Sequence, residues 1–119
     1  MSEPTKQWDG DTVRKWLESR FSASRSDQDR ADRGGRTCED DYDKAAAEEW
    51  VCRAVMKGDA ASDQARFAEK LKQLLGQDDY LRPGVHDERR FEREVRSCLR
   101  KLIKMTKANT GFDNLLHHQ

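Results

Sequence analysis

Apolar residues recur at alternating intervals of four and three positions in the segment RRFEREVRSCLRKLIKMTK, which covers residues 89–107. This spacing places the apolar side chains on one side of an α-helix and most charged side chains on the other. We therefore predict a helix over residues 88–108, ended by the sequence Asn-Thr-Gly. Its apolar side, which we call the seam, is expected to pack in the core or against a second copy in a homodimer; the seam consists of Phe91, Val95, Cys98, Leu99, Leu102 and Met105.

Three further helices are predicted, over residues 10–21, residues 40–57 and a segment that ends near residue 75. Because only 34% of the residues are hydrophobic, the core is lean, and amphipathic helices need less apolar surface than a sheet sandwich. We predict an all-α protein, a small four-helix bundle in a single domain over residues 1–119. Residues that cap helix N-termini mark three of the starts: Asp9 for the first helix, Asp59 or Ser62 for the third and Asp87 for the last.

Residues 22–41, SASRSDQDRADRGGRTCEDD, contain almost no large apolar side chain. Such a segment buries too little apolar surface to offset the chain entropy that ordering would cost. We therefore predict a long flexible polar loop between the first and second helices. The tail over residues 112–119 is expected either to fold back on the bundle or to remain free.

The sequence contains no apolar run of about 18 residues that could span a membrane, and the N-terminus has no apolar signal region. The three cysteines, Cys38, Cys52 and Cys98, are odd in number and widely spaced. Free thiols in a reducing compartment fit this pattern better than a disulfide framework. We predict a soluble intracellular protein, cytoplasmic or nuclear, without a membrane partner.

The chain is formally neutral, yet residues 88–107 contain eight basic residues against three acidic ones, and the remainder contains fifteen against twenty. An exposed helix usually mixes both signs of charge, because like charges four residues apart repel each other. Arg90 and Lys101 flank the apolar edge of this helix. Opposite the seam lies a one-sided row of cations, which we call the basic stripe: Arg89, Arg93, Arg96, Arg100, Lys104 and Lys107.

The basic stripe would extend over about 27 Å, with neighbouring cations about 5–6 Å apart, close to the spacing of successive phosphates along a nucleic-acid strand. Arginine, whose planar guanidinium makes paired contacts with phosphate, outnumbers lysine in this helix. Double-stranded RNA is recognised mainly through its shape and backbone. We therefore predict binding of nucleic acid, with duplex RNA favoured, by contacts between the stripe and phosphates.

The basic stripe is also compatible with two different roles. The helix could pair with an acidic protein surface, such as residues 39–49 of another copy, in an interaction or oligomerisation module. Alternatively, the stripe could be a solvated face, or be neutralised by acidic residues of the same chain.

No motif in the sequence indicates catalysis or a cofactor. The cysteines lack the spacing of a zinc site, and His117 and His118 lie in the tail. His86 has no evident nucleophile beside it, and the RGGR sequence lacks the lysine and the preceding strand of a phosphate-binding loop. We predict a non-enzymatic regulatory protein that uses no metal or cofactor, and we identify no family from these motifs.

Overall fold

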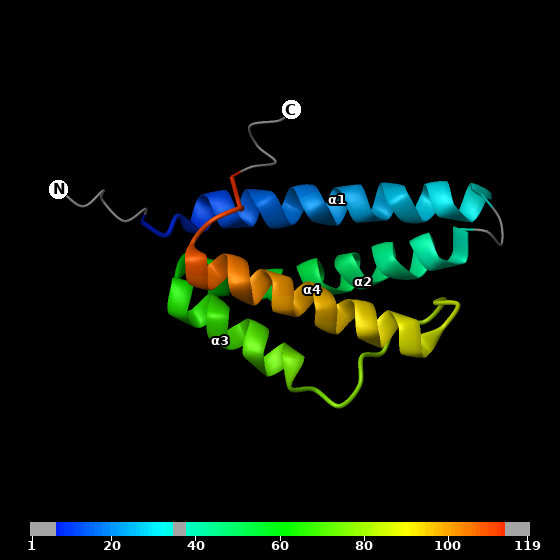
Figure 1. The fold of residues 1–119 in the computed structure, drawn as a ribbon. Coiled ribbons are helices and arrows are strands. Elements are labelled where there is room, and N and C mark those ends of the chain that lie inside the picture. Colours follow the sequence, from blue (N-terminus) through cyan, green and yellow to red (C-terminus); the bar gives the residue numbers. More distant parts are fainter. Residues whose placement is uncertain (1–6, 35–37, 114–119) are drawn as a thin grey trace.

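The computed structural model describes residues 7–34 and 38–113 (Figure 1). These residues form four α-helices and a short 3₁₀ helix, in the order α1 (Gly10–Gly34), α2 (Glu39–Met56), η2 (Ala60–Ser62), α3 (Gln64–Leu75) and α4 (Glu88–Ala108). No strand occurs within these two ranges, so the prediction of an all-α protein is confirmed. None of the described helices has a stretch long and apolar enough to cross a membrane.

Aspartate side chains fix the starts of three helices. The carboxylates of Asp9, Asp63 and Asp87 accept hydrogen bonds from backbone N–H groups in the first turns of α1, α3 and α4. The predicted caps Asp9 and Asp87 are therefore confirmed. The predicted cap of α3 is wrong, because Asp59 and Ser62 form the turn around η2 and the helix begins only after Asp63.

The prediction of a flexible loop over residues 22–41 is wrong for residues 22–34 and 39–41, which are helical in α1 and α2, while residues 35–37 lie outside the described ranges. The first helix continues because its buried stripe continues at helical spacing with small and polar side chains: Ser24, Gln28 and Ala31. The polar members are satisfied, since Ser24 Oγ donates to the carbonyl of Phe21 at 2.7 Å and the Gln28 amide donates to the carbonyl of Ser24 at 3.3 Å. Small buried side chains on α2, the alanines at 45–47, accommodate this face.

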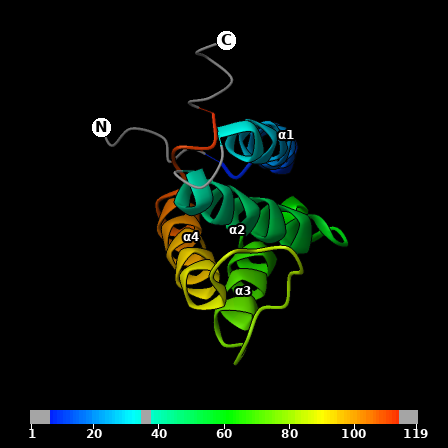
Figure 2. The same cartoon turned by 90° about the vertical axis from the view of Figure 1, so that its right-hand side faces the viewer.

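Helix α2 occupies the middle of the fold, with α1 on one side and α4 on the other, and α3 packs mainly on α4 (Figure 2). Each helix contributes completely buried apolar side chains to one core, for example Leu17, Val51, Phe67 and Leu99. The outer side of α4 is left free to face solvent.

The chain folds back after α4 at least as far as Phe112, which is 4% exposed. Its ring makes edge-on contacts with Trp8 and Trp16, at centroid distances of 5.6 and 5.4 Å, and with Phe67 at 6.1 Å. This outcome favours the folded-back alternative for the start of the tail, whereas residues 114–119 lie outside the described ranges.

Candidate nucleic-acid interface

Five of the six residues of the basic stripe lie on the exposed outer side of α4. They are Arg89, Arg93, Arg100, Lys104 and Lys107. In the part of the chain that the structure describes, none of the five side chains makes an ion pair or a hydrogen bond. From the first to the last, the row extends over about 27 Å of one continuous helix. We call these five residues the free stripe.

The sixth stripe residue, Arg96, is engaged within the chain. Its side chain is 30% exposed, and its guanidinium donates to the carbonyl of Asp78 at 3.2 Å and lies 5.1 Å from the centre of the Tyr80 ring. It also lies 3.8 Å from Glu92, one turn earlier on α4. Arg96 therefore fastens the loop between α3 and α4, and we assign the candidate interface to the free stripe.

Part of the basic charge of α4 is neutralised by the acidic start of α2. Arg90 Nη1 lies 2.8 Å from the carboxylate of Asp40 and 3.1 Å from that of Asp43. Neutralisation by acidic residues of the same chain thus holds for Arg90, which lies beside the free stripe. No member of the free stripe makes an ion pair among the described residues, although the charge of Arg93 helps to lower the pKa of Asp87.

A completely buried carboxylate fixes the N-terminal end of the candidate interface. Asp43 accepts hydrogen bonds from the backbone N–H groups of His86 and Asp87, at 2.8 and 2.9 Å, in addition to its contact with Arg90. Asp87 in turn caps α4, and the N–H groups of Arg90 and Arg89 lower the pKa of its carboxyl below the ordinary value. The free stripe is therefore presented by a helix whose start is held firmly on α2.

The seam lies in the core of the chain itself. Phe91, Val95, Leu99 and Leu102 are at most 1% exposed, and Cys98 and Met105 pack partly buried against the same core. The sequence left two alternatives for the seam, the core or a dimer contact. The four buried residues lie in the core. Only the edge formed by Cys98 and Met105 remains partly accessible.

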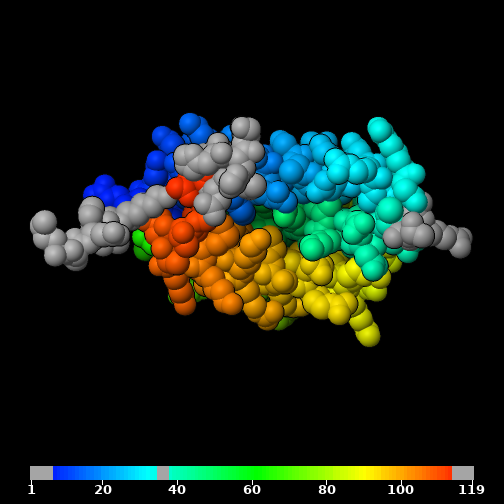
Figure 3. Space-filling view, turned by 45° about the horizontal axis from the view of Figure 1, so that its top comes forward, coloured from blue at the N-terminus to red at the C-terminus, as the bar shows by residue number. Residues whose placement is uncertain are grey.

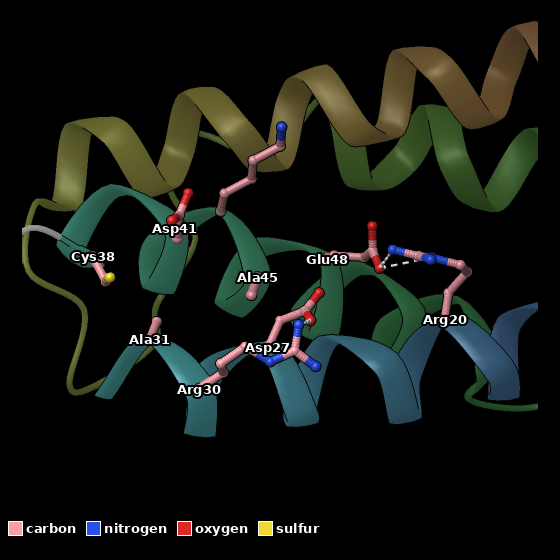
Figure 4. A pocket seen from close by; sticks show the side chains of 9 residues that line it. Arg20, Asp27, Arg30, Ala31, Cys38, Asp41, Ala45 and Glu48 are labelled. Atoms are coloured by element: carbon pink, nitrogen blue, oxygen red, sulfur yellow. Dashed lines mark hydrogen bonds and ion pairs between the residues drawn. The ribbon is translucent and has the colours of Figure 1, made fainter. Parts of the chain in front are cut away.

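A charged hollow of about 420 Å³ between α1 and α2 offers no comparable site (Figure 4). Its arginines meet acidic partners, since Arg20 donates to Glu48 at 2.9 Å and Arg30 lies 3.8 Å from Asp27. Among residues 7–34 and 38–113, no group of three or more His, Cys, Asp or Glu side chains is arranged to hold a metal ion.

The structure adds Lys101 to the cationic surface. It is exposed, makes no ion pair within the described ranges, and lies between the free stripe and a hollow bordered by α1. Its charge was visible in the sequence, but its angular position near the seam indicated an edge against the core.

No family model, curated protein or solved structure matches this chain; the candidate interface is therefore interpreted from its own chemistry.

Proposed function

We propose that this chain is a non-enzymatic regulatory protein, a small helical bundle that binds nucleic acid, with duplex RNA preferred, through the free stripe of α4. The observation that supports this proposal is the row of five exposed cations without an ion-pair partner in the described part of the chain. Keeping like charges one turn apart on a helix costs stability. An anionic partner that binds along the row would offset that cost.

The geometry of the row fits a phosphate backbone. Arg89 and Arg93 lie one turn apart, as do Arg100, Lys104 and Lys107, and two turns separate Arg93 from Arg100. All five follow one edge of a rigid helix, and each can displace a counterion from a phosphate. Three of the five are arginines, and the guanidinium of one arginine can donate to two phosphate oxygens at once. Contacts with the phosphate backbone fix where the protein lies on the nucleic acid, but they do not select a base sequence. A preference for duplex RNA would follow from the shape of the A-form helix, whose bases are difficult to reach from the major groove.

Fluorescence anisotropy with labelled duplex RNA, duplex DNA and single-stranded RNA, each at several salt concentrations, tests the proposal. Five phosphate contacts predict a log–log salt slope of about −4 to −5 for a duplex and about −3 to −4 for a single strand. The variant Arg100→Ala should lower the magnitude of the slope by about one. Absence of binding at low salt, or a slope that Arg100→Ala leaves unchanged, would refute the proposed interface.

An acidic protein surface is the second candidate partner. The first turn of α2 offers one such surface on another copy of this chain, because Asp40 is 80% exposed although it contacts Arg90, and Asp41 is exposed as well. Association between copies that weakens with added salt and occurs without nucleic acid would favour this alternative. Sedimentation of the purified chain over a range of concentrations and salt distinguishes the two.

A further inference from the structure

A hollow of about 520 Å³ opens on the side of the molecule where α1 and α4 flank α2. Figure 3 shows this side, with α1 in blue to cyan, α4 in yellow to orange, and α2 in green between them. The volume lies within the range of about 300–1,000 Å³ that is usual for small-molecule sites. The apolar part of its lining is formed by Trp16, Cys52, Cys98, Leu102 and Met105.

The floor of this hollow is apolar and polarisable. Burial raises the pKa of the Cys98 thiol to about 12 and raises that of Cys52 as well, so both sulfur atoms remain protonated and uncharged at neutral pH. Such thiols behave as small hydrophobic groups, and the flexible thioether of Met105 adapts to irregular shapes. The floor therefore suits an apolar body, either aromatic or aliphatic.

One end of the hollow is built by the turn after α4. Gly111 adopts a φ of 93°, which L side chains rarely adopt, and a Cβ placed there would lie 3.1 Å from the terminal methyl of Met105. A glycine at this position thus leaves Met105 room to line the hollow. The Trp16 ring is held in place by its edge-on contact with Phe112.

The rim of the hollow is positively charged. Arg20 and Glu48 neutralise each other, which leaves Lys101 as the cation without an ion-pair partner in the described ranges. Glu94 on the same helix also acts on the Cys98 thiol, but less strongly than Lys101, so the net charge at this edge is positive. An anionic head group is favoured here, and a cationic one is disfavoured.

We propose that this hollow is a binding site for a small anionic amphiphile, a compound whose apolar body fills the floor and whose single carboxylate or sulfonate pairs with Lys101. The inference does not rest on the proposed function, because none of the residues that line the hollow belongs to the free stripe. It assigns a function to the accessible edge of the seam, where Cys98 and Met105 remain partly exposed.

The test is a fluorescence titration of the full chain with 8-anilinonaphthalene-1-sulfonate, an aromatic anion, followed by displacement with dodecanoate. We expect one saturable site per chain that dodecanoate empties. Lys101→Glu should weaken binding about tenfold or more, and Cys98→Phe, which fills the floor, should abolish it. The matched control Lys72→Glu reverses an exposed charge on α3, a helix that contributes no residue to the hollow, and should change affinity less than about twofold.

Two further measurements make the result decisive. Thermal unfolding by circular dichroism identifies folded variants, because this probe also binds partly unfolded states. If Cys98→Phe fails to fold, Lys101→Glu alone decides, since its side chain is exposed. N-phenyl-1-naphthylamine, the uncharged parent of the probe, should bind more weakly. Equal affinity of the two dyes, unchanged binding to Lys101→Glu, or no saturable site would each overturn the proposal.

Discussion

The carboxylate of Asp43 is completely buried, and it joins α2 to the residues that precede α4. Replacing it with alanine would leave the N–H groups of His86 and Asp87 without their acceptor and would remove one partner of Arg90. Breaking a buried charged contact of this kind costs about 3 kcal/mol or more of unfolding free energy. We therefore expect Asp43→Ala to unfold at a much lower urea concentration, as measured by circular dichroism.

The control for this substitution is Asp41→Ala, in the same turn of α2. Asp41 is exposed, and substitutions at such positions usually change stability by no more than about 0.5 kcal/mol. Equal urea midpoints for the two variants would show that the Asp43 contacts do not hold α4 in place.

The cap of α4 should make stability depend on pH. The pKa of Asp87 is lowered because its carboxylate accepts hydrogen bonds from the N–H groups of Arg90 and Arg89 in the folded state. Its charged form therefore stabilises the folded chain above the ordinary aspartate pKa of about 4, and this contribution is lost as pH falls through the lower folded value. The stability advantage of the wild type over Asp87→Asn should be constant from pH 7 to about pH 5 and shrink below about pH 4.

Urea midpoints of both proteins over this pH range measure the effect. Asparagine also caps helices, so the comparison isolates the charge of Asp87 from its hydrogen bonds. An advantage that persists undiminished to pH 3 would contradict the assignment.

At the scale of the element, two arginines that both belong to the predicted basic stripe of α4 have different roles. Arg93 is exposed and unpaired within the described ranges, whereas Arg96 contacts the carbonyl of Asp78 and the ring of Tyr80. We expect Arg96→Ala to lose about 1 kcal/mol of unfolding free energy. Arg93→Ala should leave stability within about 0.5 kcal/mol of the wild type but weaken duplex RNA binding at low salt.

Urea unfolding and anisotropy of the same two variants separate these roles. If Arg96→Ala is as stable as the wild type, the contact with the loop is unimportant in solution. If Arg93→Ala binds RNA as tightly as the wild type, the free stripe is not the interface.

The bounds of α4 could be predicted from the sequence because its apolar spacing is regular and both its ends are marked. The second half of α1 could not be predicted by the same rule, which counts large apolar residues. Its buried positions are Ser24, Gln28 and Ala31, which are small or polar and become buried only when α1 packs on α2. The amide of Gln28, for example, contacts Glu49 on α2 and Arg82 in the loop before α4.

At the scale of the whole molecule, the candidate sites also depend on contacts between residues far apart in the sequence, which a single segment does not reveal. The angle of each cation on α4 was predictable from helical geometry, but its partners were not. Arg96 is excluded from the candidate interface because its guanidinium donates to the carbonyl of Asp78, a loop residue eighteen positions away. The hollow beside Lys101 depends on how α1 and α4 are spaced across α2. That spacing follows from packing between helices and has no signature in any one segment.

A neutral chain binds an anionic polymer only if its cations are gathered on one surface, so position should matter more than net charge. Two variants of identical formal charge test this directly. Arg93→Glu with Arg100→Glu reverses two members of the free stripe. Lys15→Glu with Arg33→Glu reverses two exposed cations on α1 that also make no ion pair in the described ranges. Both variants change the formal charge from zero to −4.

We expect the α4 variant to lose duplex RNA binding at low salt and the α1 variant to retain most of it. Removing two phosphate contacts and replacing each with a repulsive charge acts locally, within a Debye length of about 10 Å at 0.1 M salt. Anisotropy measures the two affinities, and circular dichroism checks that both variants keep the helicity of the wild type. Equal losses in the two variants would mean that RNA responds only to overall charge, and α4 would then have no special part in binding.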